Sequence, residues 1–372
     1  MSPYHLISSA EAFARLEQFD HIIDVRTPLE FAEDHLPGAV NWPVLSNEER
    51  VVVGTLYRQE PLEARKLGAA MVARNIARHL DEQRAIMQKH WRPLVYCWRG
   101  GQRSGSMNWF LNQIGFKSLQ LVGGYKAFRA EVRKTLDELP TRLDFVVLCG
   151  RTGTGKTRLL GSLARAGHQM LDLEALARHR GSVLGGWPGQ PQPSQKAFDT
   201  ALWQALSRMD PARPVFVESE SRKIGGVQLP ESLHQHLRQR GRCVWVAMAD
   251  AGRVQLLLED YAHFQAQPAS FAALLDALVA LRGRERVQRW QAMAQAGHWA
   301  EVFGELMREH YDPGYERSLT QHFPQLAQAP RIELRDASGP EIERAVDALG
   351  ALAHPSAAVT TPAITPAVPP AP

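Results

Sequence analysis

Residues 144–160 read DFVVLCGRTGTGKTRLL, and this order of residue types predicts a strand, a loop and a helix. DFVVLC is an apolar run rich in branched side chains, which is typical of a strand buried in a parallel sheet. GRTGTGKT (150–157) fits the pattern G-x-x-x-x-G-K-[ST], and TRLLGSLARAG then shows helical periodicity until a glycine ends it. The stretch therefore predicts a parallel α/β fold of the P-loop type.

The glycine-rich loop predicts a diphosphate-binding site. Its backbone N–H groups would surround phosphate oxygens, the Lys156 ammonium would reach the terminal oxygens, and the Thr157 hydroxyl could hold Mg²⁺. ATP or GTP is the usual ligand, but such a loop recognises a diphosphate and not a base. The expected diphosphate-binding residues are Gly150, Arg151, Thr152, Gly153, Thr154, Gly155, Lys156 and Thr157.

Three acidic residues are candidates to help hold a magnesium ion. Glu218 and Glu220 follow the apolar run PVFV, and Asp172 lies in MLDLE. Each could equally be a solvated acid at a strand end or a helix-capping residue. Cys149 is expected to pack within the strand rather than to act as a nucleophile. The basic turn HRGSVLGG (179–186) could contact phosphate or be an ordinary loop.

Strands alternate with helical patterns on both sides of the phosphate loop, which predicts two parallel α/β units. We expect a first domain at residues 1–138, a P-loop domain with a helical C-terminal part at 139–353, and a disordered Pro/Ala-rich tail at 354–372. In RVQRWQAMAQAGHW (286–299) the aromatic residues are expected to be core on one face rather than to stack on RNA. The expected strands are HIIDV (21–25), PLVYC (93–97), SLQLVGG (118–124), PVFVESES (214–221) and RCVWVAMAD (242–250), and residues 251–325 are expected to be helical.

The stretch VYCWRGGQRSG (95–105) places a cysteine between an expected strand and an expected helix. The thiolate is the reactive form of cysteine, and converging backbone N–H groups, the helix dipole and Arg103 would all favour it. The same loop can hold an anion, so it fits either attack on a phosphate ester or transport of a sulfur-family atom as a persulfide. We expect Cys97 to be catalytic, with an anion loop of Arg99, Gly100, Gly101, Gln102, Arg103 and Ser104.

DVRTPLEFAEDHLPGAVNWP (24–43) and GGYKAFR (123–129) resemble the opening and closing motifs of rhodanese-type sulfurtransferase domains. Asp24 and Arg26 match the Asp-x-Arg of that family and are further candidate site residues. The resemblance covers roughly residues 5–135 and implies that Cys97 holds a persulfide. The interval between the loop cysteine and arginine departs from the usual rhodanese pattern. Most such loops have the arginine five places after the cysteine, whereas Arg103 is six places after it, as in rhodanese-related phosphatases, and this wider loop favours a tetrahedral oxyanion.

The order of the two domains, together with LDLEALARHRGSVLG (171–185), VFVESESRKIG (215–225) and HYDPGYERS (310–318), resembles the bacterial tRNA 2-selenouridine synthase family over about residues 5–350. The resemblance implies a transferase that replaces the sulfur of 2-thiouridine by selenium from selenophosphate, at wobble position 34 of the tRNAs for Lys, Glu and Gln. It also implies S-geranylation with geranyl diphosphate and a selenophosphate-producing enzyme as the donor source. We expect no tightly bound cofactor.

The composition is that of an ordinary globular protein. The 372 residues are 44% hydrophobic and 22% charged, with a net charge of +4 that is compatible with a polyanionic partner such as tRNA. Three widely spaced cysteines predict a cytoplasmic location, and we expect no signal peptide and no membrane span. A rhodanese-related C-x5-R phosphatase fused to a kinase-like P-loop module is the alternative. A non-catalytic RNA-binding regulator is disfavoured by the intact Cys97, Arg103 and Lys156.

Overall fold

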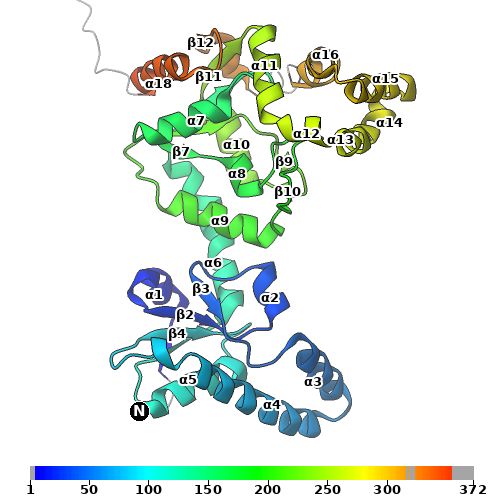
Figure 1. Ribbon diagram of the computed structural model, residues 1–372. Coiled ribbons are helices and arrows are strands. Elements are labelled where there is room, and N and C mark those ends of the chain that lie inside the picture. Colours follow the sequence, from blue (N-terminus) through cyan, green and yellow to red (C-terminus); the bar gives the residue numbers. More distant parts are fainter. Residues whose placement is uncertain (1–4, 316, 318–322, 354–372) are drawn as a thin grey trace, which may run out of the picture. The chain divides into compact units, whose positions relative to one another are not determined.

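The computed structural model describes residues 5–315, 317 and 323–353, which form two compact units (Figure 1). The first unit comprises Met1–Arg142, Leu173–Met209 and Glu220–His236, and the second comprises Leu143–Asp172, Asp210–Ser219 and Leu237–Pro372. The expected disordered tail at 354–372 lies outside the described residues. Across the described ranges, no helix combines the length and the apolar character that crossing a membrane requires.

The first unit contains a five-stranded parallel sheet with the order β1-β5-β4-β2-β3. The strands are β1 (Leu6–Ile7), β2 (His21–Asp24), β3 (Ala39–Asn41), β4 (Pro93–Tyr96) and β5 (Leu119–Leu121). The main helices are α1 (Ser9–Phe13), α2 (Pro28–Glu33), α3 (Asn47–Gln59), α4 (Pro61–Glu82), α5 (Gln102–Ile114) and α6 (Gly124–Glu138). Short 3-10 turns lie at η1 (Leu16–Gln18), η2 (Arg84–Ile86) and η3 (Leu139–Arg142).

Helices α4 and α5 pack on one face of this sheet, around an apolar cluster that includes Ile76, Trp91, Val95 and Met107. Fully burying one such side chain contributes about 1.5–3 kcal/mol. On α6, Phe128 packs edge-on against Trp203 of α9 (Gln195–Ser207). The first unit thus also holds α8 (Leu173–Ala177), α9, and the hairpin strands β9 (Lys223–Ile224) and β10 (Val227–Gln228).

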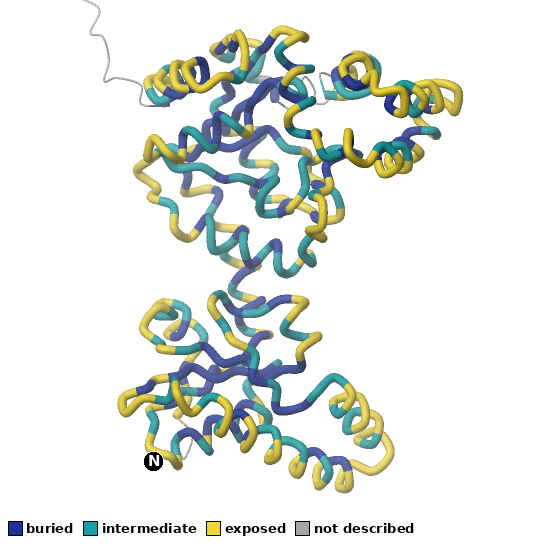
Figure 2. The backbone as a smooth tube through the Cα atoms, viewed as in Figure 1, coloured by how far each residue is buried: buried dark blue, intermediate teal, exposed yellow. Residues whose placement is uncertain are grey.

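The second unit contains another five-stranded parallel sheet, with the order β12-β11-β6-β8-β7. Its strands are β6 (Phe145–Cys149), β7 (Gln169–Leu171), β8 (Val215–Glu218), β11 (Arg242–Met248) and β12 (Arg331–Leu334). Every residue of β6 and β8 is buried, which explains the apolar runs FVVLC and VFV in these two strands. Figure 2 colours the buried residues of the described chain dark blue. Helices α7 (Lys156–Arg165) and α18 (Gly339–Ala353) share one apolar cluster with this sheet.

The remaining helices of the second unit follow β11, where the sequence predicts helix. They are α11 (Asp250–Asp260), α12 (Ala262–Ala266), α13 (Pro268–Leu275), η4 (Asp276–Leu278), α14 (Val279–Arg282), α15 (Arg284–Gln295), α16 (Trp299–Leu306), the π-helical turn η5 (Met307–Tyr311) and η6 (Pro324–Gln328). The division between the two units falls within α10 (Glu231–Arg240), after His236. Trp290 and Trp299 are buried, so the aromatic residues of this region are core, as expected.

The structure confirms the expected fold class of two parallel α/β units with a helical part. Each expected strand is present, and all but β6 end before the expected last residue. Strand β12 and helix α18 were not predicted. In β12, Ile332 and Leu334 are buried while Arg331 and Glu333 are exposed, because this strand lies at the edge of its sheet.

Candidate functional site

Cys97 directly follows β4, and α5 begins five residues later, so the thiol lies at the carboxyl edge of the first sheet beside a helix N-terminus. The side chain is only 3% exposed. The Ser104 hydroxyl donates a hydrogen bond of 3.1 Å to the Cys97 sulfur. The strand-to-helix loop therefore aims both a hydroxyl donor and the positive end of the helix dipole at one sulfur atom.

Gly100 of the loop and Gly124 of the closing motif are required by close backbone contacts. A Cβ at Gly124 would lie 2.3 Å from the Cys97 carbonyl oxygen, and a Cβ at Gly100, where φ is +67°, would lie 2.4 Å from the Leu121 carbonyl oxygen. The Tyr125 backbone N–H also donates to the Cys97 carbonyl at 2.9 Å. The GGYKAFR motif thus holds the cysteine loop directly, which explains why the two stretches occur together.

Gln120 of β5 is a supporting residue that the sequence reasoning missed. Its side-chain amide is 2.7 Å from the Gly100 carbonyl, 3.1 Å from the Gly101 carbonyl and 2.9 Å from the Ser104 hydroxyl oxygen. Because the Ser104 oxygen accepts from Gln120, its own proton is left for the Cys97 sulfur at 3.1 Å or the Gly101 carbonyl at 3.3 Å. A polar residue between Leu119 and Leu121 in a buried strand was the available signal, since a buried amide requires partners.

Gln120→Leu is expected to loosen the cysteine loop, because two carbonyls and a hydroxyl lose their donor. The free energy of unfolding should fall by about 1–3 kcal/mol. Alkylation of Cys97 by iodoacetamide, followed on its own peptide by mass spectrometry, should accelerate by about tenfold or more because local opening becomes easier. Gln113→Leu, at an exposed position of α5, is the matched control and should leave both values unchanged. Equal alkylation rates in the two variants would show that Gln120 does not hold the loop.

Arg103 of the loop is paired with Glu30 of α2 at 2.9 Å. The same carboxylate oxygen of Glu30 accepts from the Thr27 backbone N–H at 3.1 Å, within the capping box of α2. Burial pushes the pKa of Glu30 upward, but the Arg103 guanidinium and the Thr27 N–H outweigh it and hold that pKa below its usual value. An oxyanion bound at Cys97 would therefore interact with Arg103 while Arg103 is also paired with Glu30. The spacing of residues within the loop could not predict this pairing with Glu30.

Asp24 and Arg26 lie beneath this loop as a buried pair with exposures of 0% and 1%. The Arg26 guanidinium donates to the Asp24 carboxylate at 2.6 Å and to the Asp34 carbonyl at 2.6 Å, and it stacks 3.9 Å from the Tyr125 ring centroid. These contacts occupy both side chains and brace the strand ends around the cysteine.

The phosphate loop occupies residues 150–155, between the end of β6 and the start of α7. A Cβ at Gly150 would lie 2.3 Å from the Val246 carbonyl oxygen, so only glycine fits at the first position of the motif. The Lys156 ammonium donates to the carbonyls of Gly150 at 2.8 Å and Arg151 at 3.1 Å, and Lys156 is 8% exposed. A phosphate oxygen bound here would compete with those carbonyls for the ammonium group.

Glu218 ends β8, the strand next to β6, and it is the acid that the structure brings to the phosphate loop. Burial raises the pKa of Glu218 and the charge of Asp172 adds to this, while Lys156 and a hydrogen bond with Thr157 oppose it. Among the described residues, one carboxylate oxygen of Glu218 is buried without a hydrogen-bond partner. A buried carboxylate oxygen beside the Thr157 hydroxyl fits the oxygen ligands that Mg²⁺ prefers.

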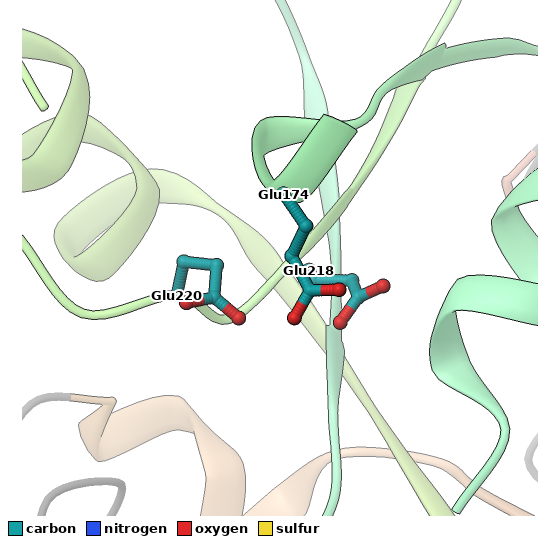
Figure 3. A group of neighbouring side chains, drawn as sticks. All are labelled: Glu174, Glu218 and Glu220. Carbon is teal, nitrogen blue, oxygen red and sulfur yellow. The ribbon is translucent and has the colours of Figure 1, made fainter. Parts of the chain in front are cut away.

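Glu220 and Glu174 add two further carboxylates after β8 and β7. One oxygen from each of Glu174, Glu218 and Glu220 lies within 4.8 Å of the others (Figure 3). Like charges this close raise one another's pKa unless a cation or a proton is shared. The sequence indicated Glu218 and Glu220 but not Glu174, which lies in the first turn of α8 just after a strand and so offered only the weak signal of a helix-start acid.

The basic turn 179–186 is organised mainly by its own backbone. The Gly181 N–H donates to the His179 ring at 3.1 Å, and the Arg180 N–H donates to the Gly185 carbonyl at 2.8 Å. Cys149 is fully buried on β6, where its contact with Cys243 of β11 and its burial hold the pKa of the Cys149 thiol well above the usual value. A thiol that stays protonated fits the packing role expected for Cys149.

Two family models match the chain. Residues 8–131 match the rhodanese-like domain, and residues 143–331 match a domain described as the tRNA 2-selenouridine synthase AAA domain. These matches cover the two candidate loops separately, since Cys97 falls within the first and residues 150–157 fall within the second.

Curated relatives extend the likeness across both halves. A tRNA 2-selenouridine synthase of Nitrosomonas europaea is 42% identical over 245 residues, which is 64% of this chain and 63% of that protein. A tRNA 2-selenouridine synthase of Cupriavidus pinatubonensis is 36% identical over 332 residues, 79% of this chain and 87% of that protein. The aligned part of the chain thus spans less than two thirds of the Nitrosomonas protein but most of the Cupriavidus one.

Among solved structures, the N-terminal domain of a putative ATP/GTP binding protein from Clostridium difficile 630 is 35% identical. It covers 34% of this chain and 98% of its own chain, with a TM-score of 0.31.

Proposed function

We propose that this chain, which belongs to the tRNA 2-selenouridine synthase family, replaces the sulfur of 2-thiouridine in tRNA by selenium. The observation that carries the proposal is the cysteine loop, in which Ser104 donates to the Cys97 sulfur at the N-terminus of α5 and Arg103 lies in the first turn of the same helix. Selenophosphate is a tetrahedral oxyanion and suits the six-residue interval from Cys97 to Arg103. In this reaction Cys97 receives or positions the selenium, and the loop N–H groups and Arg103 hold its phosphate.

The phosphate loop supplies the second half of the reaction. We propose that geranyl diphosphate binds there, that Lys156 and Thr157 hold the diphosphate while the allylic C–O bond breaks, and that the geranyl group passes to the sulfur of 2-thiouridine. Geranylation makes the sulfur a better leaving group, which selenium then displaces. A loop that recognises a diphosphate and not a base supports this choice of substrate. The target is the wobble uridine of the tRNAs for Lys, Glu and Gln, and a separate selenophosphate-producing enzyme supplies the donor.

A divalent cation fits the second site, because Thr157 and Glu218 offer a hydroxyl and a buried, unpartnered carboxylate oxygen. When bound, Mg²⁺ would neutralise charge on the departing diphosphate. The protein's own residues keep the carboxylate beside the loop: β8 is fully buried next to β6, and Lys156 offsets part of the charge of Glu218. We propose that the reaction takes place in the cytoplasm, because a reducing compartment keeps thiols such as those of Cys97, Cys149 and Cys243 free.

Glu218→Gln is expected to lower Mg²⁺-dependent prenyl transfer by about tenfold or more, because an amide binds the cation more weakly than a carboxylate. Burial raises the pKa of Glu218 above the value of about 4.3 that is usual for an exposed glutamate. As the pH is lowered, protonation of Glu218 should therefore begin to weaken Mg²⁺ binding by the wild type at a higher pH than an exposed glutamate would. Below that raised pKa, the apparent Mg²⁺ affinity should fall about tenfold per pH unit. Titrations of prenyl transfer with MgCl₂ at several pH values measure both effects.

Glu301→Gln, on an exposed part of α16, is the control for that titration and should behave like the wild type. An undiminished Mg²⁺ response in Glu218→Gln would remove Glu218 from the cation site. Activity that survives EDTA unchanged would remove the cation itself.

The function is tested by mass analysis of nucleosides from 2-thiouridine-containing tRNA incubated with the purified full chain. With geranyl diphosphate alone, S-geranyl-2-thiouridine should accumulate. With selenophosphate added, 2-selenouridine should replace it. The proposed synthase would be wrong if neither product forms under any condition and the protein instead releases phosphate from a simple aryl phosphate. That result would favour the phosphatase, which the spacing from Cys97 to Arg103 also fits.

A further inference from the structure

Tyr315 lies beside the phosphate-binding lysine. The centre of its ring is 5.3 Å from the Lys156 ammonium nitrogen, and its hydroxyl is 2.8 Å from the Ser219 hydroxyl, just beyond β8. An aromatic face attracts a cation at this distance, and the attraction grows when water is excluded.

The segment that carries Tyr315 is tied to the phosphate loop by a buried arginine. Arg253 of α11 is 1% exposed, and its two terminal nitrogens donate to Asp312 at 2.9 Å and 2.6 Å. The Arg253 Nε–H donates to the Thr152 carbonyl of the loop at 2.9 Å. Asp312 precedes Tyr315 by three residues. The ring is therefore held against the loop at two points, the Arg253 bridge and the Ser219 hydroxyl, and not by the attraction to Lys156 alone.

A ring in this place has a chemical use that depends on the proposed function. When an allylic diphosphate ionises, positive charge develops on the carbon attached to the diphosphate. That carbon is one bond from an oxygen of the group that Lys156 holds. Water stabilises such charge in solution, whereas a protein must supply a fixed, electron-rich surface at the same position. The Tyr315 face offers that surface, and its hydroxyl, the nucleophilic group of the side chain, is hydrogen-bonded with Ser219.

We propose that Tyr315 presents its ring to the allylic carbon of the prenyl diphosphate and stabilises the charge that develops there; this inference rests on the proposed geranyl transfer. The C–O bond breaks and its electron pair goes to the diphosphate, whose charge Lys156 offsets. A sulfur lone pair of 2-thiouridine forms the new C–S bond, and the N3 proton of the base passes to solvent. The ring itself is unchanged. The residue thereby also favours allylic over saturated alkyl diphosphates as substrates.

The test is a substitution series at Tyr315 in the full chain, with kcat for geranyl transfer to 2-thiouridine-containing tRNA as the readout. Tyr315→Phe and Tyr315→Trp keep an aromatic face and should stay within about threefold of the wild type. Tyr315→Leu keeps an apolar side chain without that face, and its kcat should fall between about 5-fold and 30-fold. Binding of inorganic diphosphate, measured by calorimetry, should be the same in all four proteins, because it generates no carbocation.

Three results would overturn this role. A leucine variant as fast as the wild type would show that the face does not matter. A phenylalanine variant as slow as the leucine variant would assign the effect to the hydroxyl and its Ser219 contact. If weaker diphosphate binding accounts for the whole loss of kcat in the leucine variant, the ring contributes to substrate binding and not to stabilisation of the developing charge. Tyr57→Leu, at an exposed position of α3, is the matched control and should be unaffected.

The wild-type arm separates this inference from the proposed function. If the wild type transfers no geranyl group, the proposed function fails and the role of Tyr315 fails with it. If the wild type transfers the group and Tyr315→Leu is equally fast, only the role of Tyr315 fails.

Discussion

Cys97→Ser is expected to abolish selenium incorporation into tRNA and to leave geranyl transfer within about twofold of the wild type. Serine keeps the size of the side chain but not its chemistry, because a hydroxyl stays protonated at neutral pH where a thiol can ionise. The substitution therefore tests the sulfur atom and not the shape of the loop. Ser104 can still donate to the new oxygen, and the Gln120 contacts with Gly100 and Gly101 do not involve residue 97.

The separation of the two activities follows from the composition of the two sites. The Cys97 loop is built by β4, β5 and the start of α5, whereas the phosphate loop is built by β6 and α7. Each sheet has its own apolar cluster, so a change of one atom at Cys97 should not reach the second core. Mass analysis of tRNA nucleosides after single incubations reads both products in one sample.

Cys243→Ser is the matched control, since it makes the same chemical change at another buried thiol that carries no proposed chemistry. It should keep both activities. Loss of geranylation in Cys97→Ser would show that one site serves both steps and would end the proposed division of roles. Aryl phosphate hydrolysis by the wild type that is lost in Cys97→Ser would favour the phosphatase instead.

Local sequence predicted the parts of this protein whose conformation depends on neighbours in the chain. The run DFVVLC became β6 because every one of its strand residues is buried, and Gly150 is required by a carbonyl 2.3 Å from where its Cβ would be. The cysteine loop likewise needs Gly100 and Gly124 at close backbone contacts. Periodicity, apolar runs and glycine spacing report such constraints directly, so the fold class and the position of both loops could be predicted.

The missed residues are those whose role depends on contacts between distant parts of the chain. Glu30 meets Arg103 across 73 positions, and Ser219 meets Tyr315 across 96. Gln120 reaches the cysteine loop because the β4–β5 register pairs it with Val95, which no local pattern reveals. Edge strand β12 was missed for a related reason: its alternating exposure exists only because it joins β11 on one side. Sequence spacing predicted the positions of the two loops but not the distant side chains that contact them.

Lys156→Ala is expected to reduce geranyl transfer by about 100-fold to 1000-fold, because the ammonium offsets charge on the departing diphosphate. The same substitution should also reduce the stability of the protein. Removing the ammonium leaves the Gly150 and Arg151 carbonyls without their donor, which should lower the free energy of unfolding by about 1–3 kcal/mol. It also removes the cation that opposes the raised pKa of Glu218, so that pKa should rise further and the Mg²⁺ response should shift to higher pH.

Lys156→Met distinguishes the loss of the ammonium group from the loss of the apolar stem, since methionine keeps most of the stem and loses the charge and the hydrogen bonds. Both variants should be inactive in geranyl transfer, and Lys223→Ala, at an exposed lysine, should be fully active. Retained transfer in either Lys156 variant would mean that the loop binds another ligand. Chemically S-geranylated tRNA then tests the order of steps. Because that substrate has already passed the step that needs Lys156, the Lys156 variants should convert it to 2-selenouridine with selenophosphate, and Cys97→Ser should not.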